Sequence, residues 1–226
     1  PKGIKKLLAA HVNDDGLLFE ASILYHYYAL RAFTRLADIA YAHGVDLYNA
    51  QMEDATPRDG RNGKKSAKMM FDALLYFPFQ DGTMPAVKDS GAPGGGFAVE
   101  FRDLTAIYEK HYKDPSRLAM MKQYLRILDA AKNRRAAPKC VNTADADFAL
   151  NGKNILGSSL YPSTGYAILR ADPDDVDALS LNVTYGPYGG GHGHPDKLAI
   201  SLYSKREIIL PDLGRYEYGN PLQASW

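Results

Sequence analysis

The sequence predicts an α+β protein in which a helical half is followed by a half made of strands. Before residue 134, apolar residues recur at steps of three and four, which is the period of an amphipathic helix. After residue 147, short runs alternate apolar and polar residues with a period of two, which is typical of half-buried strands. Because the helices precede the strands, we expect two segregated layers or domains and not a βαβ sheet.

Four helices are expected, over residues 23–42, 65–77, 101–112 and 116–133. The first has the most regular pattern, since its apolar side chains all fall on one face. The second is expected to end before Pro78, which cannot continue a helix. Pro115 stands at the favoured first position of the last helix.

Four strands are expected in the second half, over residues 165–170, 178–185, 198–203 and 207–210. Between the two halves, residues 134–147 (RRAAPKCVNTADAD) have the composition of a linker. We therefore expect a helical domain over residues 1–137 and a strand domain over residues 138–226.

Residues 77–96, between the second and third helices, are expected to form an irregular loop. The sequence FPFQDGTMPAVKDSGAPGGG contains too much glycine and proline for a helix or a strand. Loops of this length are usually functional or disordered. Lys88 and Asp89 lie in this loop and could contact a ligand, although most charges in such loops are merely solvated.

The bulk composition excludes several classes of protein. The chain has 226 residues, 46% of them hydrophobic, which suffices for a core of one large or two modest domains. A net charge of +1 argues against general nucleic-acid binding, which needs a basic surface. No apolar run reaches the roughly 18–20 residues of a membrane span, and the single cysteine, Cys140, rules out an intramolecular disulfide.

The segment GPYGGGHGHPDKL, residues 186–198, is the first candidate for chemistry. His192 and His194 alternate along what we expect to be extended chain, so we expect their side chains to face opposite ways, and the two need not share a role. Asp212 follows the last expected strand, so His194 and Asp212 could meet as two ligands of a zinc-type site. Such a site needs three or four donors. The alternative is that Asp212 caps a turn and His194 bonds to nearby backbone.

The segment DDGLLFEASILYHYYALRAF, residues 14–33, is the second candidate, because it places Glu20, Tyr25 and His26 at the start of the first expected helix. Taken alone, such residues on a helix are more often packed than catalytic. Motifs of other enzyme classes are absent from the sequence: there is no GxSxG elbow, no P-loop, and no GxGxxG that follows a strand and opens a helix.

Together the two segments resemble the heparinase II/III-like polysaccharide lyases. DDGLLFEASILYHYYAL is similar to the DG...E.S..YH segment of that family, and GPYGGGHGHPDKLAISLY followed by LPDLGRYEYG is similar to its HGHxDxL and DxG stretches, in the same order. Within that family, these segments most resemble those of the exolytic oligoalginate lyase branch. The resemblance implies the second half of an (α/α) toroid over residues 1–137, followed by the first strands of an antiparallel β-sandwich over residues 138–226.

The resemblance also implies a reaction, the β-elimination of 4-linked uronic-acid polysaccharides. Alginate oligosaccharides are the first expected substrate, heparin or heparan sulfate the alternative, and a non-catalytic uronate-binding protein is a further possibility. Elimination needs the uronate carboxylate neutralised, a base near C5 and an acid at the leaving oxygen. Tyrosine can serve as both acid and base once its ordinary pKa of about 10 is lowered.

Carried over position by position, Tyr25 matches the catalytic tyrosine of that family and His192 matches the histidine that the strand domain contributes. His194 and Asp212 match two ligands of a structural metal, zinc or another divalent ion. The glycines would let a sugar chain approach His192. Four residues are candidate substrate contacts, each with a structural role as the alternative: Glu20, His26, Lys88 and Asp89.

The resemblance places further groups outside these 226 residues: an Asn/His pair upstream of the tyrosine, and a third metal ligand, a histidine, beyond Trp226. We therefore expect an internal fragment, inactive on its own, of a bacterial periplasmic or secreted lyase. The expected partner is an acidic polysaccharide, with neither nucleic acid nor an organic cofactor, and a homodimer is left open.

Overall fold

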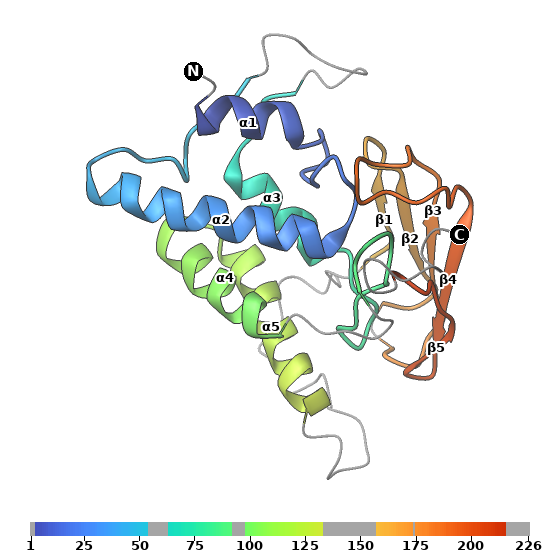
Figure 1. Cartoon of the computed structure of the whole chain (residues 1–226). Coiled ribbons are helices and arrows are strands. Elements are labelled where there is room, and N and C mark those ends of the chain that lie inside the picture. The colour runs from blue at the N-terminus through green and yellow to red at the C-terminus, as the bar shows by residue number, and fades with distance from the viewer. Residues whose placement is uncertain (1–2, 54–62, 92–97, 133–156, 174, 216–226) are drawn as a thin grey trace.

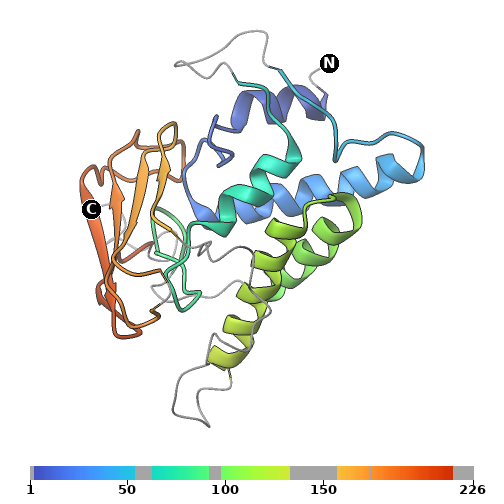
Figure 2. The same cartoon turned by 180° about the vertical axis from the view of Figure 1, so that it is seen from behind.

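The computed structural model describes residues 3–53, 63–91, 98–132, 157–173 and 175–215. Within these ranges a group of helices lies beside one antiparallel sheet, and an irregular segment passes between them (Figure 1). The same arrangement is seen from behind in Figure 2. The predicted order, helices before strands, is confirmed. The expected domain boundary at residues 137 and 138 lies outside the described residues.

The helical half contains α1 (Ile4–His11), α2 (Ile23–Ala42), α3 (Ala67–Leu75), α4 (Ala98–His111) and α5 (Pro115–Lys132). Helix α2 has the predicted bounds, because Ser22 caps its first turn and its apolar stripe faces the core. Helix α1 is not among the predicted helices. Its eight residues are too few for a helical period to be recognised. None of the described helices is long and apolar enough to span a membrane.

The sheet contains β1 (Ser159–Tyr161), β2 (Tyr166–Arg170), β3 (Ser180–Thr184), β4 (Ala199–Ser204) and β5 (Glu207–Leu210). The strands pair in chain order, each antiparallel to the next. Four of them lie where the sequence predicts strands. The three-residue β1 was missed because it is too short to show alternation, and it pairs with β2 through a tight turn at Gly165, where φ is 85°.

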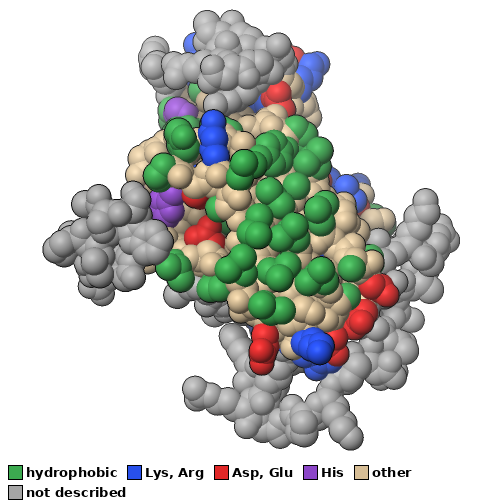
Figure 3. Space-filling view, turned by 90° about the vertical axis from the view of Figure 1, so that its right-hand side faces the viewer, with side chains coloured by type: hydrophobic (Ala, Val, Ile, Leu, Met, Phe, Trp, Pro, Cys, Tyr) green, Lys and Arg blue, Asp and Glu red, His purple; other side chains and the backbone are tan. Residues whose placement is uncertain are grey.

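The two faces of the sheet differ in their surroundings. The inner face turns toward the helices and is buried, with Tyr166, Ile168 and Tyr203 in the interior. On the outer face, cross-strand register aligns two apolar rows, Leu160-Ala167-Val183-Ile200 and Leu169-Leu181-Leu202-Leu210. Hydrophobic side chains gather over this face (Figure 3). A second sheet on this face would complete the expected sandwich, and the toroid likewise stays a prediction, since the described residues hold one sheet and five helices.

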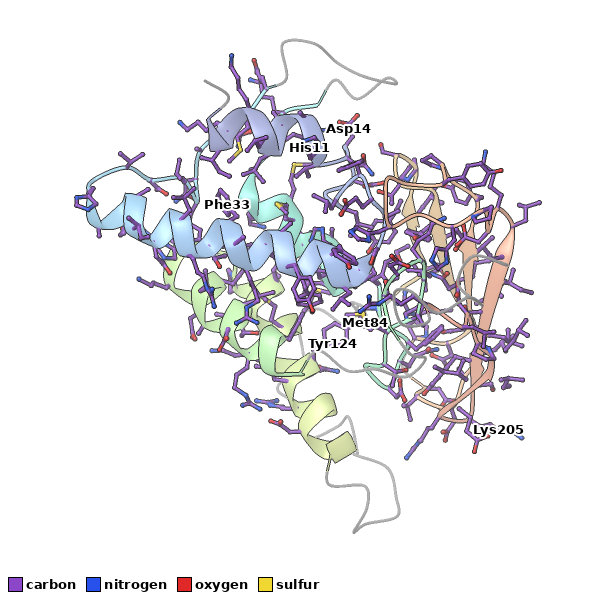
Figure 4. All side chains as sticks on the ribbon, viewed as in Figure 1. His11, Asp14, Phe33, Met84, Tyr124 and Lys205 are labelled. Atoms are coloured by element: carbon purple, nitrogen blue, oxygen red, sulfur yellow. The ribbon has the colours of Figure 1, made fainter. Side chains whose placement is uncertain are left out.

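Residues 77–90, here called the central segment, run between the helices and the sheet. The segment is irregular, as the sequence predicts, but it is buried along nearly its whole length. Met84 lies between the helices and the strands in Figure 4. Polar groups of the sheet satisfy its backbone and side chains: the Arg170 guanidinium donates to the carbonyl oxygen of Pro78, and the Ser180 hydroxyl donates to Gln80. The central segment is thus the interior packing layer between the two halves.

Candidate active site

The predicted site residues meet where three parts of the chain come together: the start of α2, the end of the central segment, and residues 186–198, here called the histidine loop. The Ser90 hydroxyl accepts the N–H of Ile23 at 2.9 Å and lies 3.3 Å from the Ser22 hydroxyl. The N–H of Asp89 donates to the carbonyl oxygen of His192 at 3.4 Å. The central segment therefore ties the helix start to a loop of the sheet.

Tyr25 and His192 lie face to face at this junction. Tyr25 occupies the first turn of α2, where its N–H donates to the Ser22 hydroxyl. Its ring stacks on the ring of His192, with centroids 3.4 Å apart and planes 13° from parallel. Both side chains are partly exposed. The structure thus brings together the two residues that the sequence predicts as catalytic, one from each half of the chain.

The glycines of the histidine loop allow it to approach the chain that enters α2. A Cβ at Gly189 would lie 2.5 Å from the carbonyl oxygen of Glu20, and a Cβ at Gly193 would lie 1.5 Å from that of Tyr188. A Cβ at Gly191, in contrast, would meet no atom within 4 Å. Gly189 thus makes room for the backbone of Glu20, and Gly193 makes room for the backbone of the loop itself. That these glycines clear a path for a sugar stays a prediction.

Asp89 is hydrogen-bonded to both histidines of the loop. One carboxylate oxygen lies 3.0 Å from Nδ1 of His192, and the other lies 2.8 Å from Nε2 of His194. The expectation that the two rings face opposite ways is wrong, because the loop is a turn and residues two apart in extended chain share a side in any case. The Asp89 side chain is only 4% exposed. Its burial places it beneath the histidines and away from a surface ligand.

Lys88 is also turned inward, which corrects its expected role as a substrate contact. Its side chain is 1% exposed and forms an ion pair with Asp196 of the histidine loop. The same ammonium group donates to the carbonyl oxygen of His194 at 3.3 Å. Lys88 therefore fastens the loop to the central segment and presents no charge to a ligand.

Three residues other than glycine have left-handed backbone conformations around the site. They are Ala21, Lys88 and Leu198, with φ values of 62°, 55° and 64°. Ala21 precedes Ser22, the N-cap of α2, Lys88 precedes Asp89, and Leu198 ends the histidine loop. This conformation costs an ordinary residue on the order of 1 kcal/mol, and such costs concentrate at functional sites. Each segment of the site therefore contains one strained residue.

His26 does not reach the site, which corrects the prediction that it contacts substrate. Its ring is completely buried. Nδ1 accepts the N–H of Leu18 at 3.0 Å, and Nε2 lies 3.0 Å from the carbonyl oxygen of Met70. Burial lowers the pKa of His26 to about 4, so the ring is neutral at pH 7. His26 joins three parts of the helical core.

Glu20 is the fourth expected substrate contact, and it lies beside the histidine loop. Its Cγ would be 3.5 Å from a Cβ placed at Gly190. The side chain is partly exposed, which leaves it accessible from the same side as the loop. Of the four candidate contacts, Glu20 alone keeps a position from which it could touch a ligand.

His194, Asp196 and Asp212 line a pocket of about 440 Å³ on the sheet side of the histidine loop. Burial raises the pKa of Asp212, and the negative charge of Asp196 acts in the same direction. One carboxylate oxygen of Asp196 is buried and lacks a hydrogen-bond partner. The pocket is therefore acidic, which suits a cation better than an anionic sugar.

The two predicted metal ligands, His194 and Asp212, line the same pocket, but they do not form a complete metal site. In the described ranges, no group of three or more His, Cys, Asp or Glu side chains is arranged to hold an ion. Nε2 of His194 is also engaged by Asp89. A structural site normally needs four ligands, so the residues present do not by themselves fit a bound metal.

Ser90 and Asp196 are site residues that sequence reasoning missed. Asp196 lies inside the GHGHPDKL stretch, where its place beside two histidines was an available signal. Ser90 carries no comparable signal, because its bond to Ile23 joins positions 67 residues apart. Only the folded chain shows that it caps α2 together with Ser22.

Comparison with known families finds a match in the last part of the chain. Residues 156–226 match the family model described as heparinase II/III-like, C-terminal. This region of the chain is therefore similar to the C-terminal part of the heparinase II/III-like proteins. The matched region holds His192, His194 and Asp212. No curated protein matches the chain.

Two groups of solved structures share the fold over most of the chain. Heparinase III, the BT4657 gene product, is 20% identical over 92% of this chain and 27% of its own, with a TM-score of 0.59. The heparan sulfate lyase HepC from Pedobacter heparinus is 18% identical over 95% of this chain and 28% of its own, with a TM-score of 0.61. The chain thus has a heparinase-like fold and spans little more than a quarter of the length of these structures.

Proposed function

We propose that this chain belongs to a polysaccharide lyase that cleaves 4-linked uronic-acid polysaccharides by β-elimination. The observation that carries the proposal is the stacked pair of Tyr25 and His192, in which each half of the fold supplies one ring. Both rings are partly exposed, so a ligand can reach them. The heparinase-like fold and the matched C-terminal domain support the same reaction class.

In this elimination the C5–H bond and the C4–O bond of the sugar break, and a C4=C5 double bond forms. One proton leaves C5, and one proton is delivered to the departing glycosidic oxygen. We assign both transfers to Tyr25, because a phenol hydroxyl can take and return a proton. His192, stacked on Tyr25, is assigned the contact with the uronate beside the reacting carbon.

The proposed substrate is an acidic polysaccharide that contains uronate. Heparan sulfate comes first, because it is the substrate named for one solved structure with this fold. Alginate oligosaccharides come second, on the strength of the GHGHPDKL and LPDLG segments. Incubation with each polymer, followed by ultraviolet absorbance of the unsaturated uronate, distinguishes the two. A periplasmic or secreted location belongs to the same proposal.

Substitution of Tyr25 by phenylalanine tests the proposal in the full natural protein that carries this chain. Loss of the hydroxyl is expected to lower kcat roughly 10²- to 10⁴-fold, the usual contribution of a positioned acid or base. Tyr28→Phe is the matched control, because Tyr28 lies on the same helix, 53% exposed, with its ring edge-on to Tyr25. It should leave kcat within about twofold.

The outcomes separate a lyase from a binding protein. Unsaturated product that disappears in Tyr25→Phe supports the lyase. Tight binding of either polymer without unsaturated product would mean a uronate-binding protein and would overturn the proposal. Hydrolysis to saturated sugar ends would instead favour a metal hydrolase at the pocket of His194 and Asp212.

A divalent metal ion at His194 and Asp212 is a secondary proposal. Both residues line the acidic pocket. Asp196 lines it too, and a cation there would offset the cost of burying its unpartnered carboxylate oxygen. At least one further ligand is required. Metal analysis of the purified full protein, before and after chelation, tests it: a stoichiometric ion lost in His194→Ala is expected, and metal-free protein of unchanged stability would exclude a structural ion.

A further inference from the structure

Asp89 connects two rings of the histidine loop to the central segment. The carboxylate is buried, and each of its oxygens lies within 3.0 Å of a ring nitrogen. The two partners are 103 and 105 positions away in sequence. This is a structural role that neither the sequence pattern nor the reaction chemistry assigns to it.

The chemistry of a carboxylate fixes which ring nitrogens hold protons. An ionised carboxylate only accepts hydrogen bonds. Nδ1 of His192 and Nε2 of His194 therefore both donate to Asp89. A neutral His192 then has its lone pair at Nε2, and a neutral His194 has its lone pair at Nδ1.

Asp89 is itself held firmly, so it can impose this arrangement. Its own N–H donates to the His192 carbonyl oxygen. The preceding Lys88 pairs with Asp196, and the following Ser90 accepts the N–H of Ile23 at the start of α2. Two independent anchors therefore flank the carboxylate, one to the loop and one to the helix of Tyr25.

We propose that Asp89 is the positioning residue of this site, which keeps the His192 ring flat on Tyr25 with its Nδ1 protonated. Nε2 then becomes the single nitrogen through which His192 exchanges a proton or a hydrogen bond with substrate. The same carboxylate fixes the ring of His194, so the two histidines are oriented as one unit. As far as it concerns catalysis, the inference rests on the proposed lyase function.

Asp89→Asn is a sharp test because it keeps the shape of the side chain and changes only its hydrogen bonds. A carboxamide offers one acceptor oxygen and one donor nitrogen. It cannot accept from both rings, so one histidine must adopt the other tautomer or lose its bond. Asp81→Asn is the matched control: Asp81 is equally buried in the central segment, but it accepts bonds from Thr83.

The tautomers can be measured without any activity. Long-range ¹H–¹⁵N spectra of the full natural protein, labelled at histidine, are recorded at mildly alkaline pH, with His192→Ala and His194→Ala providing assignments. We expect His192 as the Nδ1–H form and His194 as the Nε2–H form. Asp89→Asn should change at least one, and Asp81→Asn neither. The opposite tautomer at His192 in the unaltered chain would overturn the proposal.

The kinetic test uses a double-mutant cycle in the full natural protein. Asp89→Asn is expected to lower kcat by about 10- to 100-fold, with KM changed less than about threefold, as for other residues that orient a functional histidine. In a His192→Ala background it should cause no further loss. Additive losses would mean a merely structural role for Asp89. If the unaltered protein has no lyase activity, the proposed function fails, while the tautomer spectra still decide whether Asp89 orients the histidines.

Discussion

Two histidines lie near the start of α2 in environments of opposite character. His26 is enclosed in the helical core, and both of its ring nitrogens are hydrogen-bonded to backbone groups of other segments. His192 is partly exposed, stacks on Tyr25, the neighbour of His26, and is bonded to a carboxylate. The start of α2 thus has a structural side, where His26 packs into the core, and a chemical side, where Tyr25 and His192 form the candidate site. The contacts of a residue, and not its type, decide on which side it acts.

Alanine substitutions should separate the two sides most clearly. His26→Ala leaves the N–H of Leu18 and the carbonyl of Met70 unpaired in the core, and we expect a loss of about 3–5 kcal/mol in the free energy of unfolding. His192→Ala should cost less, about 1–3 kcal/mol, because the ring is partly exposed and its loss removes one hydrogen-bond partner of the buried Asp89. Chemical denaturation measures both. Equal losses of stability would remove the distinction.

The pH dependence of stability should come from the structural side. The pKa of His26 is about 4 in the folded chain and about 6.5 when the chain unfolds. Between these values the unfolded state binds more protons, so the free energy of unfolding falls as pH drops from about 6.5 to 4, by about 3 kcal/mol in all. Above pH 6.5 this contribution to stability is fully present.

His26→Gln is the control for that pH effect. A glutamine amide can still accept from Leu18 and donate to Met70, but it does not titrate. Denaturant unfolding at pH 7 and pH 5 should show a smaller difference for His26→Gln than for the unaltered chain. An identical difference in both proteins would assign the pH dependence to other groups.

A pair of glycine substitutions tests the close backbone approach within the histidine loop, on the chemical side. Gly193→Ala would drive a Cβ into the carbonyl oxygen of Tyr188, whereas a Cβ at Gly191 meets no atom within 4 Å. We expect Gly193→Ala to cost about 1–3 kcal/mol of stability and to lower lyase activity with it. Gly191→Ala should change both little. Matching effects would show that the loop adapts and that its close approach is not required.

The smallest expected effect concerns the acidic pocket. Burial and Asp196 raise the pKa of Asp212, so its negative charge is unfavourable in the folded chain at neutral pH. In protein freed of metal, Asp212→Asn should raise the free energy of unfolding by less than about 1 kcal/mol, since the amide oxygen can still accept the N–H of Gly214. Thermal unfolding in chelator measures it. A loss of stability there would mean that the charge itself is stabilising.

Local signals made much of the fold predictable. Helix α2 was predicted to the residue because its periodicity is long and Ser22 caps it, and β5 was predicted because it is bounded by a turn and by Pro211. The short elements α1 and β1 were missed, since eight residues span barely two helical turns and three residues are too few to show the alternation of a strand.

The site was predictable in its residues but not in its contacts. Tyr25 and His192 were singled out from two segments, and the structure stacks them. The inward position of Lys88 and the shared bonds of Asp89 depend on contacts between positions more than 100 residues apart. No local pattern encodes such contacts. A resemblance to a family indicates which positions belong to the site. Only the folded chain shows which side chains are buried beneath those positions.

The three left-handed residues around the site, Ala21, Lys88 and Leu198, have a consequence for engineering the chain. Glycine at such a position relieves backbone strain and also widens the range of conformations open to that segment. A search for heat-tolerant variants would therefore be drawn to these positions. Variants selected there for thermal stability should hold the Tyr25 and His192 rings less rigidly. A gain in thermal stability at these positions would therefore lower turnover.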